Sequence, residues 1–177
     1  MKTKHLFSLF FIAMLPFVQS CAPKREKKEK LEKYEMNFEP SEDWQNLELT
    51  RNNTQAHSGK NVCELDSTKE FSITFLKKLS AFAKGSPAGL KVGMWVRLDD
   101  VNKSTALVMS VENEGKVLQW ESMNLKPIVK KPIFWTEVST LFNIKPGTPN
   151  NATLKVYLWN EGKQHLLIDD VVIKPQY

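Results

Sequence analysis

The sequence predicts an all-β fold, a two-layer antiparallel β-sandwich of about nine strands that occupies residues 35–177. Apolar residues recur there at every second position in short runs, the period expected of a strand with one buried face. Clusters of Gly, Pro, Asn and Ser close these runs at the spacing typical of a sandwich. The sequence shows no internal repeat and no second domain.

The runs can be followed in order along the chain. We expect strands within residues 36–39, 47–50, 62–65, 71–76, 90–98, 107–111, 117–123, 133–142, 154–159 and 166–173. The run 90–98 alternates best, with Val92, Met94 and Val96 on one side and Trp95 on the other. Residues 113–115 (Asn-Glu-Gly) are typical of a hairpin turn. The pattern at residues 76–83 also permits a short helix.

The N-terminus predicts export. A basic start with Lys2 and Lys4 precedes an apolar run at 6–18, which is shorter than the ~20 residues a membrane-spanning helix needs. This layout is typical of a secretory signal peptide at 1–20. The small residue before Cys21 resembles the lipobox of bacterial lipoproteins, which implies cleavage before Cys21 and acylation of its thiol and amine. The alternative is an ordinary signal peptide with a chance cysteine near the cut.

Residues 21–34 predict a charged tether between the lipid and the domain. They hold six basic residues against three glutamates and almost no apolar side chains, so they cannot form a core. Contact of the lysines with anionic head groups is compatible with this interpretation. The formal charge of +5 comes from the leader and tether, because basic and acidic residues balance from Glu35 onward. A neutral domain gives no reason to expect a nucleic-acid partner.

The sequence argues against an enzyme. Outside the leader the only histidines are His57 and His165, and no phosphate loop, serine elbow or Cys/His cluster occurs. Paired carboxylates such as Asp99-Asp100 are neighbours in sequence, so they diverge instead of facing each other across a cleft. Cys63 lies among apolar residues and is interpreted as a small core residue.

Several short patterns together resemble the jelly-roll carbohydrate-binding modules of the galactose-binding-like fold, most closely the four/nine-type modules and similar domains in lipoproteins of Bacteroidetes-like bacteria. The patterns, in order, are NFE at 37–39, Trp44, AHSGK at 56–60, GMWVR at 93–97, WTEV at 135–138, KVYLWN at 155–160 and IDDV at 168–171. The resemblance covers residues 36–174 and implies a jelly roll. It rests on the order and spacing of the patterns, since no single motif is specific.

The same resemblance implies a structural calcium at one edge of the sandwich. Carried over residue by residue, its ligands would be Glu39, backbone carbonyls around Ser58 and Lys60, and Asp169 or Asp170. Such a mixture of carboxylates and carbonyls suits calcium. Alternatively, these acidic residues are solvated strand ends.

Five tryptophans raise the possibility of an aromatic ligand platform. If the aliphatic sets fill the core, Trp95, Arg97, Tyr157 and Trp159 lie on an outer sheet face, with Glu121 beside them and Trp120 on the opposite side. The alternative is that these rings only pack the sandwich. Trp44 and Trp135 are assigned to packing.

Two functions follow as hypotheses. The first is a non-catalytic envelope lipoprotein that binds a glycan by aromatic stacking and polar contacts. The second is a structural or adaptor lipoprotein whose sandwich docks a protein partner, because a fold alone does not define a function. Ala22 after the cysteine favours an outer-membrane lipoprotein facing the periplasm, and surface display is the alternative.

Overall fold

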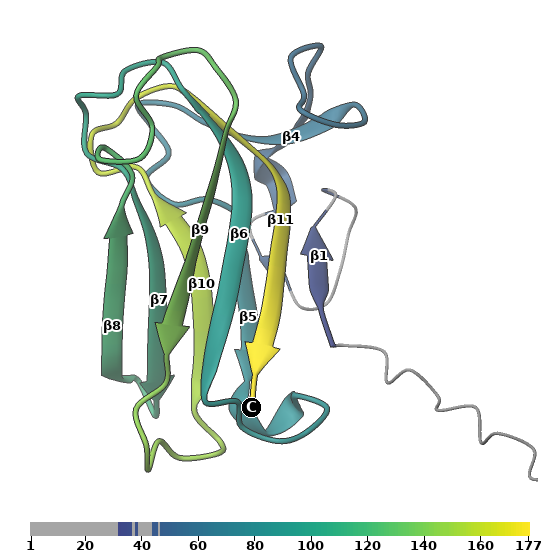
Figure 1. The fold of residues 1–177 in the computed structure, drawn as a ribbon, viewed down its shortest axis with the longest axis vertical. Helices are drawn as coiled ribbons and strands as arrows, with labels where there is room; N and C mark the ends of the chain where they lie inside the picture. Colours follow the sequence, from purple (N-terminus) through teal and green to yellow (C-terminus); the bar gives the residue numbers. More distant parts are fainter. Residues whose placement is uncertain (1–31, 37, 39–43, 46) are drawn as a thin grey trace, which may run out of the picture. The chain divides into compact units, whose positions relative to one another are not determined.

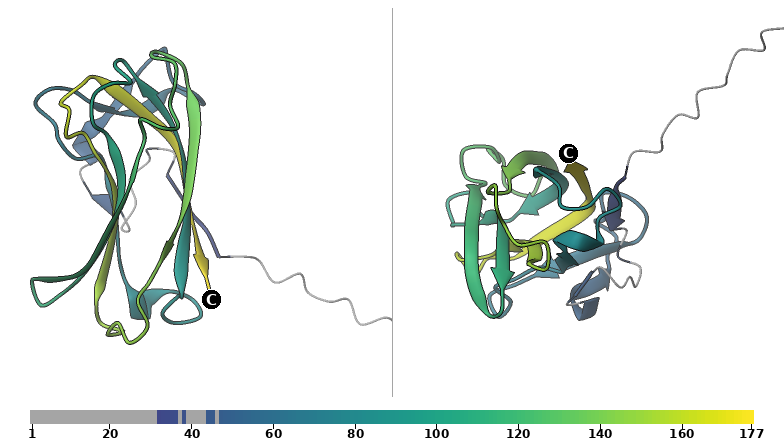
Figure 2. Two further views of the ribbon diagram at one scale, coloured as in Figure 1. Left: turned by 60° about the vertical axis from the view of Figure 1, so that its left-hand side comes forward. Right: turned by 90° about the horizontal axis from the view of Figure 1, so that it is seen from below.

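The computed structural model describes residues 32–36, 38, 44–45 and 47–177, all within the unit Leu31–Tyr177. The predicted all-β sandwich is confirmed: two antiparallel sheets stack face to face (Figures 1 and 2). The predicted signal peptide, Cys21, Glu39 and most of the predicted tether lie outside the described residues. Within the described part, no helix is both long and apolar enough to cross a membrane.

The described residues form eleven strands and two short 3-10 helices. Sheet A contains β1 (Tyr34–Met36), β3 (Thr50–Asn52), β4 (Asn61–Leu65), β6 (Gly89–Leu98), β9 (Thr136–Asn143) and β11 (Leu166–Gln176). Its order is β3-β4-β11-β6-β9, with β1 also paired to β11. Sheet B has the order β2 (Trp44–Gln45), β5 (Thr74–Lys78), β10 (Thr153–Trp159), β7 (Ala106–Asn113) and β8 (Lys116–Asn124).

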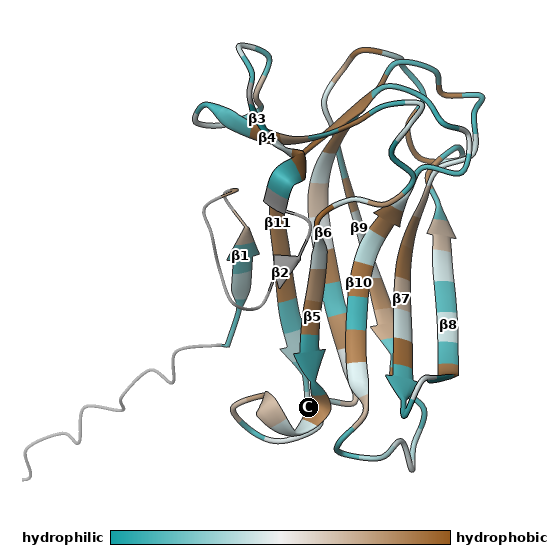
Figure 3. Ribbon diagram, turned by 180° about the vertical axis from the view of Figure 1, so that it is seen from behind, coloured by the Kyte–Doolittle hydropathy of each residue, from teal (hydrophilic) through white to brown (hydrophobic). Residues whose placement is uncertain are grey.

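The core lies between the sheets and follows the predicted alternation. In β6 the side chains from Leu90 to Leu98 at every second position are at most 4% exposed. Leu154, Val156 and Leu158 of β10 are equally buried from the other layer. Removal of this apolar surface from water is the main force that holds the two layers together. Figure 3 shows the resulting bands of alternating hydropathy along the strands of sheet B.

The structure differs from the sequence prediction at several element ends. Leu47–Leu49, expected as a strand, is a 3-10 helix that leads into β3. The helix expected within 76–83 is only the single 3-10 turn Leu79–Ala81. Strand β9 begins at Thr136, because Ile133 has a positive φ of 58° that does not fit an extended strand.

One irregularity in sheet A positions acidic side chains. The register between β11 and β6 shifts between Asp169 and Val172, and Asp170 there has a φ of 48°. Such a bulge bends a strand and re-aims its side chains. Here it brings both Asp169 and Asp170 within hydrogen-bonding distance of the β3–β4 loop, residues 53–60.

Candidate functional site

The outer face of sheet B carries a row of aromatic side chains. We call Phe71, Trp120, Tyr157 and Trp159 the aromatic face. Tyr157 and Trp159 alternate along β10 with the buried Val156 and Leu158, so they point away from the core. Phe71 forms an isolated antiparallel β-bridge with Trp159. Trp120 of β8 lies opposite the outward-facing Ser110.

The rings of the aromatic face contact one another edge to face. The ring centroids of Phe71 and Tyr157 are 5.6 Å apart at 81°, and those of Trp120 and Trp159 are 6.3 Å apart at 82°. Phe71 is 47% exposed and Trp120 is 48% exposed, although both are large and apolar. Val108, which lies opposite Tyr157 on this side of the sheet, is fully buried. The face is therefore a preformed apolar surface open to solvent.

Polar groups adjoin the rings. Lys155 lies two residues before Tyr157, on the same side of β10. Its Nζ lies 2.7 Å from the Glu112 carboxylate. Ser110 donates to the same carboxylate at 3.3 Å. Ser122 of β8 is exposed on the same side, opposite Val108. The aromatic face thus combines ring surfaces with hydrogen-bonding groups, the combination found in sites that fix the orientation of a small ligand.

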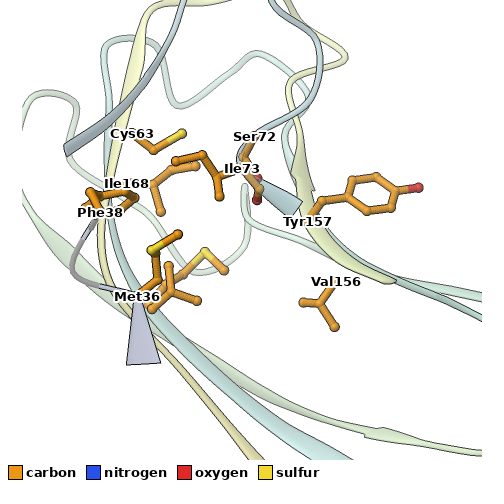
Figure 4. Close-up of a pocket in the computed structure, with 10 residues that line it drawn as sticks. Met36, Phe38, Cys63, Ser72, Ile73, Val156, Tyr157 and Ile168 are labelled. Carbon is orange, nitrogen blue, oxygen red and sulfur yellow. The ribbon is translucent and has the colours of Figure 1, made fainter. Parts of the chain in front are cut away.

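A cavity between the sheets is too small for a sugar ligand. Met36, Phe38, Cys63, Met94 and other apolar residues line it, and its free volume is about 10 Å³, at the lower limit for one water molecule. Figure 4 shows the Tyr157 ring pointing away from this cavity. Burial raises the pKa of the Cys63 thiol to about 12, which makes it an unreactive core residue.

Trp95 and Arg97 do not join the aromatic face. They lie on β6 in sheet A, whereas Tyr157 and Trp159 lie on β10 in sheet B. Arg97 donates from Nε to the Ile133 carbonyl at 3.0 Å and lies 3.6 Å from Asp99. The expectation that all four side chains share one outer face is therefore wrong. Alternation separates inward from outward positions but does not say which sheet a strand belongs to.

The prediction that Glu121 lies on the outer face is also wrong. Glu121 lies opposite the buried Met109, so it sits on the inner side of the sheet, and Gln119 donates to it at 2.7 Å. Trp120, expected on the inner side, belongs to the aromatic face. Phe71 was expected only as the first residue of a strand at 71–76 and was not among the predicted binding residues. Strand β5 starts only at Thr74, so the strand period does not hold at Phe71.

The residues proposed for calcium gather around Asp169. Its side-chain oxygens accept hydrogen bonds from the backbone N–H groups of His57 (2.9 Å), Ser58 (3.0 Å) and Asp170 (2.7 Å). Burial raises the pKa of Asp169, although these three bonds oppose the shift. Asp170 is bonded to His57 Nδ1 and Ser58 Oγ, each at 2.7 Å.

This arrangement does not fit a cation. Calcium takes six to eight oxygen ligands, but donors, not carbonyls, surround Asp169. The described residues contain no group of three or more His, Cys, Asp or Glu side chains that could hold a metal. Lys60 is exposed, with its carbonyl accepting from Asn53, and Glu39 lies outside the described residues. Calcium therefore stays a prediction that these contacts do not favour.

The same loop fixes the neighbouring rings. The His57 ring stacks on Trp95 with centroids 3.9 Å apart at 16° and meets Trp135 edge-on at 5.6 Å. Trp135 Nε1 donates to the Gln55 carbonyl at 3.0 Å, which agrees with the packing role expected for it. The side chain of Trp44 lies outside the described structure.

The His165 ring bridges two carboxylates, and we call His165, Glu64 and Asp99 the ionic clamp. Its Nε2 lies 2.8 Å from Glu64 and its Nδ1 lies 2.9 Å from Asp99. Burial lowers the pKa of His165, but the hydrogen bonds that its ring donates to Glu64 and Asp99 outweigh burial, and the net pKa shift is upward. Both ring nitrogens of His165 face carboxylates, which favours the charged imidazolium. The three residues come from strands or strand ends and do not line a cleft.

We expect this clamp to make stability depend on pH. Because the folded-state pKa is raised, the stabilisation is complete below the unfolded-state pKa of about 6.5 and is lost as pH rises through the folded-state pKa. The urea midpoint of the native protein should therefore decrease as the pH is raised from 5.5 to 8.5. His165→Gln should reduce this step, and Glu64→Gln should reduce it in part. An unchanged step in His165→Gln would contradict the clamp.

Comparison with known proteins gives the fold and no family. No family model matches the sequence, and no curated protein matches it. The CBM22-2 xylan-binding domain of Paenibacillus barcinonensis Xyn10C has a TM-score of 0.54 and 11% identity over 81% of this chain and 99% of that domain. At this identity the likeness shows a shared fold.

Other solved structures match less closely. TmCBM61 in complex with β-1,4-galactotriose has a TM-score of 0.42 and 15% identity over 76% of this chain and 90% of that one. The arabinose-bound MgGH51 α-L-arabinofuranosidase has a TM-score of 0.45 and 15% identity over 71% of this chain. This chain spans only 21% of that enzyme.

Proposed function

We propose that this domain is a non-catalytic carbohydrate-binding module that holds an oligosaccharide on the aromatic face. The observation that carries the proposal is the row formed by Phe71, Tyr157, Trp159 and Trp120. Sugar rings have apolar C–H faces that pack on aromatic side chains, and rigid rings lose little entropy when they bind. Lys155, Glu112 and Ser122 supply hydrogen bonds beside the rings.

Two further points support binding without cleavage. Glu112 is the carboxylate described beside the aromatic face, and Lys155 holds it in an ion pair. Glycoside hydrolysis usually needs two carboxyl groups placed on either side of the scissile bond. The sandwich also has the fold of a domain named for xylan binding, which makes a plant-type oligosaccharide a suitable first ligand.

The test is calorimetric titration of the full-length chain, in a detergent without sugar groups, with xylohexaose and with β-1,4-galactotriose. Trp159→Ala and Trp120→Ala should each weaken binding at least tenfold, which corresponds to about 1.4 kcal/mol. Phe134→Ala is the matched control, because Phe134 is also exposed (60%) but lies outside the aromatic face. Equal losses in all three variants would contradict the proposal. The absence of binding at millimolar sugar would favour the protein-docking function.

We further propose that Cys21 anchors the protein as a lipoprotein in the bacterial cell envelope, at the outer membrane and facing the periplasm. The support is the lipobox-like sequence that ends at Cys21, since several acyl chains give stable anchoring. In a bacterial host, Cys21→Ala should stop incorporation of labelled palmitate and move the protein to the soluble fraction. Cys63→Ala is the matched control and should keep the label, because Cys63 is a buried core thiol. Unlabelled wild-type protein would rule out the anchor.

A further inference from the structure

A second hollow lies on the outer face of sheet A, on the other layer from the aromatic face. It has a volume of about 300 Å³ and runs along β6, which lies between β9 and β11. Its lining residues are Lys91, Gly93, Met94, Trp95, Glu137, Ser139, Asp170, Val172 and Lys174. We call this hollow the sheet A groove. From Lys91 to Trp95 it extends about 13 Å, at about 3.3 Å per strand residue.

Gly93 forms the floor of the sheet A groove, and packing does not explain the glycine. A Cβ at this position would meet its nearest neighbours, Ser139 Cβ and the Val138 carbonyl, at 3.8 and 3.9 Å, which is ordinary contact. Its φ is not positive either. Glycine weakens a strand interior, where it often marks a close approach of a ligand. The consequence of Gly93 here is the open space between Lys91 and Trp95.

Two lysines face each other at one end of the sheet A groove. Lys91 of β6 and Lys174 of β11 are directly opposite in the register, and both are exposed. Neither side chain makes an ion pair or hydrogen bond with the part of the chain that the structure describes. Like charges opposite each other destabilise a sheet. An anionic ligand group between them would remove this repulsion.

The other end of the sheet A groove has different chemistry. Trp95 forms a wall there, and its ring is fixed by the stack on His57. Glu137 lies opposite Trp95 and Ser139 lies opposite Gly93, both on β9. Asp170 is already bonded to His57 and Ser58. The groove therefore offers cations at one end, and an aromatic wall with hydroxyl-binding groups at the other.

We propose that the sheet A groove is a second binding site, specific for an acidic saccharide. The carboxylate of a uronic acid lies between Lys91 and Lys174, the sugar ring lies over Gly93, and its hydroxyl groups bind Ser139 and Glu137. A bare anion would use only the lysines, and a neutral sugar would leave them unpaired. The site is independent of the aromatic face, because the two lie on different sheets.

The test is titration of the full-length, detergent-solubilised chain with trigalacturonate, followed by amide chemical shifts. We expect shifts along β6, β9 and β11. Lys174→Gln and Lys91→Gln should each weaken binding at least fivefold. Gly93→Val should abolish it while the melting temperature stays at or above that of the native protein, since a β-branched residue favours a strand. Trp120→Ala should leave the affinity for trigalacturonate unchanged.

Other results would overturn the site. Xylotriose or sodium acetate that shifts the same amides to the same extent would show that the groove does not select an acidic sugar. Dependence on Trp120 but not on Gly93 would assign trigalacturonate to the aromatic face. No binding at millimolar trigalacturonate would remove the proposal even if neutral oligosaccharides bind the aromatic face.

Discussion

Replacing Asn160 by alanine is expected to lower the free energy of unfolding by about 3–5 kcal/mol, because buried groups lose their partners at about 1–3 kcal/mol each. Asn160 is fully buried just after β10. Its Nδ2 donates to the carbonyls of Asp66 (3.1 Å), Lys69 (3.3 Å) and Gln164 (2.8 Å), and its Oδ1 accepts from Gln164 N at 3.1 Å. One side chain thus joins the β4–β5 loop to the β10–β11 loop, which connects the two sheets.

Gln164 extends this network to the β6–β7 loop. It donates to Thr105 Oγ1 at 2.9 Å and accepts from Asp100 N at 2.8 Å. Loss of Asn160 should therefore loosen three loops at one end of the sandwich. A decrease of this size is a large fraction of the 5–15 kcal/mol that stabilises a typical domain.

Urea unfolding followed by tryptophan fluorescence measures the effect. Asn160→Asp separates hydrogen bonding from volume, because it keeps the size but turns an oxygen toward three carbonyls. It should be at least as destabilising as alanine at neutral pH. Asn102→Ala is the matched control, since Asn102 is exposed in a loop and should change stability little. A loss below 1 kcal/mol in both Asn160 variants would contradict this network.

Replacing Asp169 by asparagine is expected to lower the free energy of unfolding by about 1.5–3 kcal/mol, the range for a hydrogen bond to a charged group. The substitution keeps the shape but places an NH₂ group where the carboxylate now accepts backbone N–H groups of the β3–β4 loop. At least one of the three backbone N–H groups that now donate to this carboxylate, those of His57, Ser58 and Asp170, must lose its partner. The loop should detach from sheet A, and the His57 ring should leave Trp95.

Two readouts test this expectation. Hydrogen exchange at the amides of His57 and Ser58 should speed up in Asp169→Asn, and the tryptophan emission should change as the stack is lost. Asp66→Asn is the matched control: Asp66 also accepts a backbone N–H, from Thr68 at 2.7 Å, but at an exposed turn. Its variant should keep the native unfolding midpoint. Unchanged exchange in Asp169→Asn would mean that other contacts hold the loop.

The sequence allowed most strand positions, and the buried side of the regular strands β6 and β10, to be predicted. The alternation in β6 and β10 reproduces the observed burial residue by residue. This succeeds because a strand has a fixed period of two, so apolar spacing alone decides which side chains face the core. Tyr157 and Trp159 were placed correctly on an outer face for the same reason.

The prediction failed where the local period breaks. Phe71 precedes the start of β5. The register of β7 and β8 shifts between Val111 and Glu112, close to Trp120 and Glu121, which lie on the opposite sides of the sheet from those predicted. Bulges and strand ends change the side on which a residue lies. Nothing in the sequence pattern marks them here.

By itself the sequence determined an all-β sandwich, its alternating core and the outward direction of Trp95, Tyr157 and Trp159, because these depend on side-chain period alone. Only the tertiary structure decided that Tyr157 and Trp159 meet Phe71 and Trp120 on sheet B, while Trp95 is fixed by His57 on sheet A. The physical reason is that strand pairing joins segments far apart in the chain, and period does not specify the partner.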